Sequence, residues 1–246
     1  MRIVIIGPGR LGRSLHTLWG DLGHTVTLLG RNGTLPPCDV AVLTVPDAAI
    51  TDAVGRVPAG VVALHTSGAR DLTPMRPHRP AGSLHPLMTF PGPEVALPTL
   101  TAVPAALAGD PAAVAVARQL ASDLGMSPFE VPGDRRLYHA AAVLAGNGAA
   151  ILLAEAASLL AAAGVPPAAC PAILRPLALA SVQNMSGDLG ATLTGPVARG
   201  DEQTLQEHRA ALDEHRLSDT LPLYDALIQR ARAHLAEDQT EDSDEA

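Results

Sequence analysis

A glycine-rich turn near the N-terminus constrains the fold more than any other feature. The apolar run at residues 2–6 leads directly into Gly-Pro-Gly-Arg-Leu-Gly, and a helical pattern follows. In a dinucleotide-binding turn, the glycines allow a tight turn, room for the pyrophosphate and close helix–strand packing. The helix N-terminus then faces the phosphates. We therefore predict a dinucleotide site over the alternative of a plain strand–turn–helix. Its candidate residues are Gly7, Pro8, Gly9, Arg10, Leu11 and Gly12.

The end of the next predicted strand, residues 25–29, distinguishes between two cofactors. An NAD-binding protein carries an acid about 20 residues past the glycines, where it accepts from the ribose 2′-hydroxyl. Here the strand runs into Gly30, Arg31 and Asn32, without an acid. A guanidinium pairs well with the 2′-phosphate of NADP. We expect NADP rather than NAD, with Arg31 and Asn32 among its contacts, unless Arg31 is an ordinary solvated loop residue.

The N-terminal half alternates apolar runs with helical patterns. Near-continuous Val, Ile and Leu runs indicate a parallel sheet covered on both faces. We therefore expect an α/β fold whose Rossmann dinucleotide-binding domain spans residues 1–132. Beyond the strands already named, the predicted strands are residues 40–45, 61–66, 83–86, 100–103 and 127–131, with a helix over 111–124.

The chain after Gly133 is helical in pattern. We expect an all-α substrate and dimerisation domain at residues 133–236, followed by a disordered acidic tail at 237–246. The most apolar stretch, residues 140–165, contains Asn147 and Glu155 and predicts a buried helix rather than a membrane span. A helix that is apolar nearly all round must be buried on all sides, and a second subunit could supply the surface that buries it. We therefore expect a homodimer. The predicted helices are residues 134–164, 168–184, 201–215 and 218–236.

Composition excludes several other classes. The formal net charge is −8 and aromatic residues make up 2%, so a nucleic-acid partner is not expected. The sequence contains no lysine, which excludes a lysine general acid or Schiff base. Cys38 and Cys170 match neither a metal-site spacing nor a disulfide framework. The first apolar run ends in the glycine turn, so we expect no signal peptide and a cytoplasmic protein.

Polar residues follow the predicted strands, where open parallel sheets bind ligands. We expect Val45, Pro46 and Thr66 beside the cofactor. Ser67 is a candidate for contact with the ligand, although a Ser-Gly turn is common. His85 precedes Pro86, and a histidine can exchange the proton that accompanies hydride transfer. The alternative is that His85 is a structural histidine at a strand end.

The helical half supplies two more candidate catalytic residues, His139 and Asn147. They are eight residues apart, hence about 12 Å along a helix and roughly 80° around it, so they can line one groove. Asn147 can both donate to and accept from a substrate. His139 is nearly as well explained as a structural histidine. Arg135 and Arg136 are expected to be solvated.

A polar loop at residues 192–201 lies between two predicted helices. Arg199 is the best-placed arginine for an anionic substrate carboxylate, which a guanidinium can hold through two hydrogen bonds. Thr194 is a second candidate substrate contact. Asp201 is expected as the N-cap of the next helix.

Five segments occur in an order that resembles a known family. They are the glycine turn, residues 45–47, 83–90, 139–142 with Asn147, and 194–201. Together they resemble bacterial Rossmann-like proteins with an uncharacterised C-terminal helical domain. That family is similar to ketopantoate reductase, pyrroline-5-carboxylate reductase and prephenate dehydrogenase in the 6-phosphogluconate dehydrogenase-like superfamily. The resemblance implies a Rossmann domain, a helical dimerisation domain and a cleft between them.

The resemblance leaves three functions open. The first is an NADP-dependent oxidoreductase acting on a small anionic carbonyl or hydroxy acid, with ketopantoate as one candidate. The better-known ketopantoate reductases use a lysine on the helical domain, and this chain has none. The second is a prephenate dehydrogenase-like enzyme, whose His-Pro motif and neighbouring serine resemble His85-Pro86 and Ser67. The third is a non-catalytic nucleotide-sensing or scaffold dimer.

Overall fold

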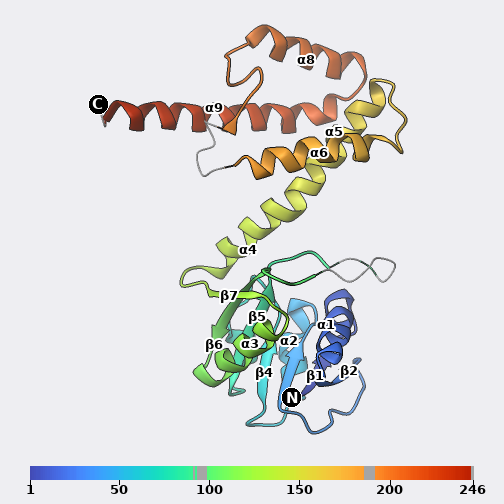
Figure 1. Cartoon of the computed structure of the whole chain (residues 1–246), viewed down its shortest axis with the longest axis vertical. Helices are drawn as coiled ribbons and strands as arrows, with labels where there is room; N and C mark the ends of the chain where they lie inside the picture. Colours follow the sequence, from blue (N-terminus) through green and yellow to red (C-terminus); the bar gives the residue numbers. More distant parts are fainter. Residues whose placement is uncertain (91, 93–98, 186–191, 245–246) are drawn as a thin grey trace. The chain divides into compact units, whose positions relative to one another are not determined.

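The computed structural model describes residues 1–90, 92, 99–185 and 192–244, with side chains as far as residue 236. The chain divides into two compact units, Met1–Asn147 and Gly148–Ala246 (Figure 1). The sequence placed a boundary earlier, at residues 132–133. Helix α4 (Arg135–Val143) belongs to the first unit because Arg135 and Tyr138 hydrogen-bond to Ser67 and His85.

The first unit contains a seven-stranded sheet of order β2-β1-β3-β4-β5-β6-β7, which confirms the predicted Rossmann-like α/β class. The strand predicted at residues 100–103 is wrong, because a turn at residues 101–102 precedes β6. The strands are β1 (Arg2–Ile6), β2 (Thr25–Leu29), β3 (Val40–Leu43), β4 (Val62–His65), β5 (Ala81–Pro86), β6 (Pro104–Gly109) and β7 (Ser127–Glu130).

One pairing departs from the expected parallel sheet. Strands β5 and β6 are antiparallel, with His85 opposite Ala106, whereas the other five pairings are parallel. A parallel crossover normally uses a helix. No helix forms in the described part of residues 87–103, and β6 therefore returns alongside β5 in the opposite direction.

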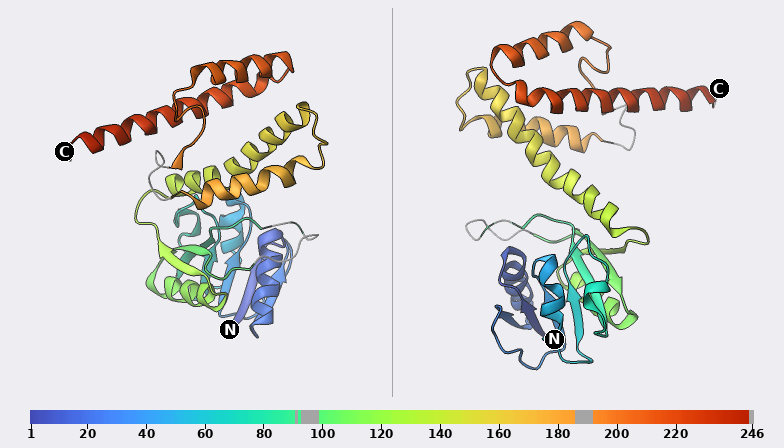
Figure 2. Two further views of the ribbon diagram at one scale, coloured as in Figure 1. Left: turned by 45° about the horizontal axis from the view of Figure 1, so that its top comes forward. Right: turned by 180° about the vertical axis from the view of Figure 1, so that it is seen from behind.

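Helices cover both faces of the sheet, as the near-continuous apolar strands predicted (Figure 2). Helices α1 (Arg10–Asp21) and α3 (Pro111–Asp123) cover one face, where the Trp19 indole donates to the Leu120 carbonyl at 3.1 Å. Helix α2 (Ile50–Val54) and the short turn η2 (Thr73–Met75) cover the other. This two-layered cover leaves the carboxyl ends of the strands for polar residues.

The second unit is helical, as predicted. It contains α5 (Ala149–Ala162), α6 (Cys170–Gln183), α8 (Glu202–Glu214), the turn η4 (Ser218–Thr220) and α9 (Leu221–Asp244). Thr220 donates to Glu155 at 3.2 Å, and Arg209 pairs with Asp225 at 2.8 Å, which ties α8, α9 and the η4 turn to α5. The α9 backbone is helical to Asp244, within the predicted disordered tail, whose side chains lie outside the described residues.

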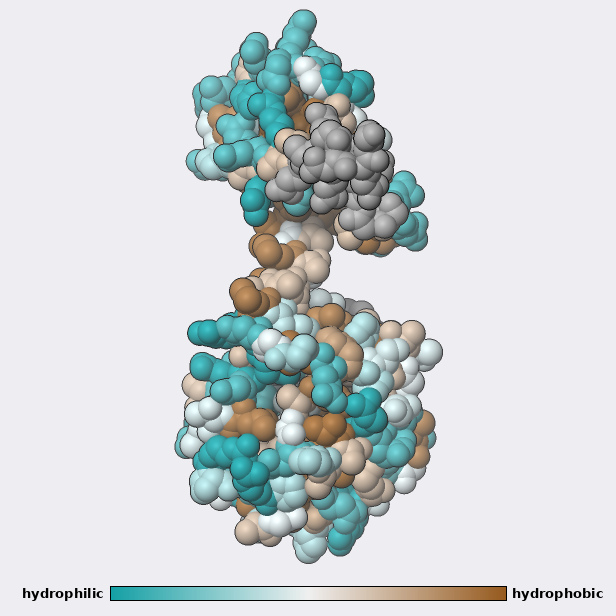
Figure 3. Space-filling model, turned by 90° about the vertical axis from the view of Figure 1, so that its left-hand side faces the viewer, coloured by the Kyte–Doolittle hydropathy of each residue, from teal (hydrophilic) through white to brown (hydrophobic). Residues whose placement is uncertain are grey.

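The predicted buried helix at residues 140–165 is wrong for a single chain. Helix α5 has no buried residue, and a π-helical turn at Leu144–Gly148 joins it to α4. By length and composition alone, one described helical stretch, Arg135–Ala162, could cross a membrane, and none of its apolar window is buried. A single such helix is a weak indication, since core helices of soluble proteins meet the same criterion. Figure 3 shows apolar residues exposed along this stretch.

Candidate functional site

The first candidate site is a cavity of about 520 Å³ at the carboxyl ends of β1, β2 and β3. This is the edge at which open α/β sheets bind ligands. Its walls come from the glycine turn, the loop after β2, the loop after β3 and helix α2. The lining residues are Ile6, Gly7, Pro8, Gly9, Gly30, Arg31, Thr44, Val45, Pro46, Ala49, Asp52, Ala53 and Arg56.

The structure confirms the framework roles predicted for Gly7 and Gly12, while the predicted pyrophosphate contact at Gly9 stays a prediction. Gly7 has φ +119°, and a Cβ there would overlap the Thr44 carbonyl, while a Cβ at Gly12 would overlap the Gly7 carbonyl. Around Gly9, by contrast, no atom lies within 4 Å of an added Cβ. Gly7 and Gly12 therefore make the turn possible, and Gly9 keeps its outer face open. The Thr44 hydroxyl donates to the Gly7 carbonyl at 2.7 Å and fixes the turn from behind.

Six of the eleven predicted cofactor residues line this cavity: Gly7, Pro8, Gly9, Arg31, Val45 and Pro46. The five that do not are Arg10, Leu11, Gly12, Asn32 and Thr66. Gly12 packs behind Gly7, and the buried Thr66 hydroxyl donates to the Leu43 carbonyl at 3.2 Å, so both serve the framework. Arg10 and Asn32 are exposed.

Thr44 also lines the cavity, at a strand end where the sequence predicts ligand binding, whereas Asp52 and Arg56 were not candidates from the sequence. Asp52 belongs to α2, whose five residues are too few for a helical period to be recognised, and Arg56 follows this helix. The half-buried Arg56 donates to the carbonyls of Gly30 and Gly33 at 3.2 and 2.5 Å. These bonds bring a second arginine beside Arg31.

A second cavity, of about 730 Å³, also lies within the first unit. Three predicted catalytic residues, His85, His139 and Asn147, line it together, whereas the fourth, Ser67, does not. Tyr138 also lines it and was not a candidate from sequence. The full lining is His85, Leu87, Met88, Thr89, Tyr138, His139, Ala141, Ala142, Val143, Ala145, Gly146 and Asn147.

Contacts from α4 fix His85 on one side of this cavity. Its Nδ1 lies 2.7 Å from the Tyr138 hydroxyl, and its ring meets the edge of His139 with centroids 6.1 Å apart. Burial, followed by the charge of Arg135 and by His139, lowers the pKa of His85 to about 4. His85 is therefore neutral at pH 7. Burial raises the pKa of Tyr138, opposed by the Arg135 charge, so its hydroxyl keeps its proton.

Gly68 lies beneath both imidazole rings. A Cβ at this position would come within 2.5 Å of His139 Cδ2 and 2.9 Å of His85 Cε1 and Nε2. Real Cβ atoms do not approach other atoms so closely. The bare main chain after β4 therefore sets how deeply the two histidines sit.

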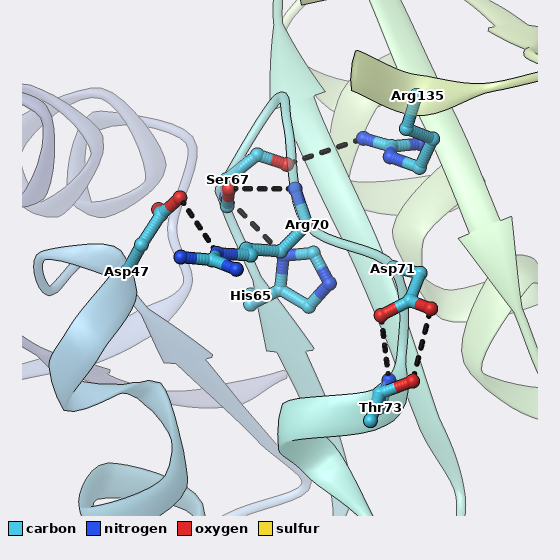
Figure 4. Close-up of polar contacts among 7 residues, drawn as sticks. All are labelled: Asp47, His65, Ser67, Arg70, Asp71, Thr73 and Arg135. Carbon is cyan, nitrogen blue, oxygen red and sulfur yellow. Dashed lines mark hydrogen bonds and ion pairs between the residues drawn. The ribbon is translucent and has the colours of Figure 1, made fainter.

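Arg135 differs from the solvated residue that the sequence predicted. It is 8% exposed, and its Nη2 donates to the Ser67 carbonyl at 3.2 Å (Figure 4). Its Nε and Nη1 have no partner among the described residues, and its guanidinium lies 5.7 Å from the Tyr138 ring centroid. The neighbouring Arg136 is exposed, as expected. The buried guanidinium of Arg135 therefore places a positive charge next to the hydrogen-bonded pair His85–Tyr138.

The loop after β4 rests on His65, at the end of that strand. His65 is fully buried, and its Nδ1 accepts from the Ser67 backbone N–H at 3.2 Å. Burial first, and then the Arg135 charge, lower the pKa of His65 to about 4. The Ser67 hydroxyl accepts from the Arg70 backbone N–H at 3.1 Å (Figure 4). In this structure, Ser67 closes a turn and its carbonyl holds Arg135.

The two predicted substrate-binding residues, Thr194 and Arg199, are exposed in the second unit and line neither cavity. Asp201 is the N-cap of α8, as predicted. Its carboxylate accepts from the Thr204 backbone N–H at 3.1 Å and from the Thr204 hydroxyl at 2.7 Å.

Three solved proteins share this fold over nearly the whole chain. A Bacteroides fragilis protein, BF3122, provisionally assigned as an NADP oxidoreductase, has a TM-score of 0.79 and 19% identity, covering 94% of this chain and 98% of that one. A reductive aminase of Aspergillus terreus in complex with NADPH has a TM-score of 0.69 and 17% identity, covering 94% and 93%.

The third is the 1-pyrroline-5-carboxylate reductase of Streptococcus pyogenes, with a TM-score of 0.65 and 17% identity, covering 95% of this chain and 98% of that one. At these identities, the likeness establishes the fold. No curated protein matches the sequence.

One family model matches residues 103–231, which is 129 of the 246 residues. The match begins just before β6 and includes the α4 residues Arg135, Tyr138 and His139. The chain therefore belongs to the family described as "Domain of unknown function (DUF2520)".

Proposed function

We propose that the protein is an NADP-dependent oxidoreductase. The observation that carries this proposal is the glycine turn, which opens at Gly9 into a cavity whose β2 side presents Arg31 instead of an acid. The likeness to a reductive aminase that binds NADPH supports the same cofactor class.

The residues of the 520 Å³ cavity fit a phosphorylated dinucleotide. The open face at Gly9 and the N-terminus of α1 suit the pyrophosphate. Arg31 suits the 2′-phosphate, and Val45 and Pro46 suit the part of the nucleotide that passes the end of β3. When bound, the nicotinamide supplies or accepts a hydride.

The 730 Å³ cavity is proposed to receive the substrate. A neutral His85 whose Nδ1 accepts from the Tyr138 hydroxyl carries its proton on Nε2, from which it can donate to a reacting oxygen. Tyr138 keeps its own proton, and by donating to Nδ1 it holds His85 in the tautomer that presents Nε2–H to the reacting oxygen. His85 regains from solvent any proton that it passes to that oxygen. His139 and Asn147, on the same helical stretch, are proposed to orient the substrate.

We propose a small anionic carbonyl or hydroxy acid as substrate, with ketopantoate as the first 2-oxo acid to test. Arg199 and Thr194, which line neither cavity, stay proposed contacts for a carboxylate at the loop of residues 192–201. We further propose that the protein is a homodimer through its helical unit, because α5 and α6 expose large apolar side chains.

Titration of the purified protein with NADPH and NADH, followed by nucleotide fluorescence, tests the cofactor first. NADPH is expected to bind more tightly because of Arg31. Binding of neither nucleotide would contradict the proposed function and favour a non-catalytic dimer.

His85→Asn then tests the chemistry with a substrate found by screening 2-oxo acids. Turnover is expected to fall by about 100-fold or more, because the positioned proton donor is lost. NADPH affinity should stay within about twofold of wild type, since His85 does not line the nucleotide cavity. The matched control is His16→Asn, on α1 and outside both cavities. Unchanged turnover in His85→Asn would remove His85 from the catalytic role.

A further inference from the structure

Arg56 joins two parts of the nucleotide cavity that are distant in sequence. It follows α2, yet its guanidinium hydrogen-bonds to the carbonyls of Gly30 and Gly33, on either side of Arg31. Both arginines line the same cavity. The loop that carries Arg31 is therefore held by a second cation.

We propose that Arg56 and Arg31 together form a two-arginine site for the 2′-phosphate of NADPH, in which Arg56 also holds the Arg31 loop in place. This inference rests on the proposed function and names a second residue that determines cofactor choice. The preference for NADPH would then depend on Arg56, in the segment after α2, as well as on the loop after β2.

The unused bonding capacity of Arg56 supports this role. A guanidinium has five N–H donors, and two of those on Arg56 point to carbonyl oxygens. Across the described part of the chain, no carboxylate pairs with Arg31 or Arg56 within 4 Å. A phosphate bound between planar guanidinium groups gains charge-assisted, directional hydrogen bonds. Both cations are thus available to an anion that enters the cavity.

Among the residues that the structure describes, Asp52 is the one acid that lines this cavity. A carboxylate beside the ribose would accept from a 2′-hydroxyl and repel a 2′-phosphate, which favours NAD. Two arginines against one acid leave a net positive charge, so we expect the phosphate to be preferred. Asp52→Asn should therefore leave the NADPH preference unchanged or increase it.

The experiment measures NADPH and NADH dissociation constants for the full chain, with 2′,5′-ADP and 5′-ADP as competing probes. In Arg56→Gln, NADPH and 2′,5′-ADP binding should weaken about tenfold or more, while NADH and 5′-ADP stay within about twofold. Arg56→Met, which keeps the apolar stem, should show the same selectivity loss if Arg56→Gln folds poorly. Arg118→Gln is the matched control, an exposed arginine on α3 paired with Glu130.

The outcomes separate the two proposals. If wild type binds neither NADPH nor NADH, the proposed function fails and this inference fails with it. If wild type prefers NADPH and both Arg56 variants keep that preference, the inference alone is overturned. An equal weakening of NADPH and NADH also overturns it, because Arg56 would then serve only the framework. A selective loss of the phosphorylated ligands supports it.

Discussion

The two units differ in how completely each can bury its own apolar side chains. Both hydrophobic core clusters lie in the first unit, on the two faces of the sheet. Among the described residues of the second unit, only Cys170, Leu205, Leu212 and Ile228 are buried hydrophobics. Meanwhile α5 and α6 expose six large apolar side chains, Ile151, Leu152, Ile173, Leu177, Leu179 and Val182. The sheet of the first unit is covered on both faces within one chain, whereas α5 and α6 leave large apolar side chains exposed, which is the basis of the proposed homodimer.

The largest expected effect tests the homodimer proposed from this difference. Leu177 on α6 is 67% exposed, and Leu177→Glu would place a charge in the proposed interface, where its desolvation is costly. We expect a dimer for wild type and a monomer for this variant in light scattering, with self-affinity reduced by about 1,000-fold or more.

Leu22→Glu is the matched control for this experiment. Leu22 is 52% exposed and stands at the end of α1 in the first unit, whereas α5 and α6 belong to the second. This variant should stay as dimeric as wild type. A monomeric wild type, or equal effects of the two substitutions, would contradict the proposal that the exposed apolar side chains of α5 and α6 form a dimer interface.

The second test concerns the stability of the first unit, whose sheet and helices pack together within one chain. Gly12→Ala would force the α1 start away from the Gly7 carbonyl and lower the free energy of unfolding by about 2–3 kcal/mol. Gly9→Ala meets no atom and should change that free energy by less than about 1 kcal/mol, while weakening NADPH binding. Trp19, the sole tryptophan, is a buried residue of α1 and reports denaturant unfolding of this unit alone. Equal effects of the two variants would contradict the distinct glycine roles.

The smallest expected effect is a pH dependence confined to the first unit. The pKa of His65 is about 4 when folded, below its ordinary value of 6.5, because burial and then the Arg135 charge disfavour the protonated ring. As pH falls, the unfolded chain takes up the proton first, so stability is full above pH 6.5 and declines toward pH 4. We expect a loss on the order of 2 kcal/mol from this group, measured by Trp19 fluorescence.

His65→Gln should flatten that decline, although the lowered pKa of His85 leaves part of it. His215→Gln, in the second unit, is the control and should leave the pH dependence as in wild type. The same slope in His65→Gln as in wild type would exclude His65 as its source.

Local signals in the sequence were sufficient to predict the Rossmann-like class, most strand positions and the framework roles of Gly7 and Gly12. They did not predict the antiparallel β6, because its direction depends on a connection rather than on strand residues. Nor did they predict the burial of Arg135, because its partners lie far away in sequence. The His85–Tyr138 bond spans 53 positions and the Arg135–Ser67 bond spans 68. The role of Arg56 was not predicted either, because its hydrogen bonds reach Gly30 and Gly33 in another loop. The neighbouring helix α2 is also too short to be recognised from the sequence.

Gly68 gives the candidate site a built-in spectroscopic reporter. Its main chain lies against the edges of both imidazole rings, so ring currents from His85 and His139 act on its amide and α protons. Either ring turning toward a ligand changes that local field. A single glycine cross-peak in a nuclear magnetic resonance spectrum therefore follows the histidines directly, with no probe attached and no substitution in the site.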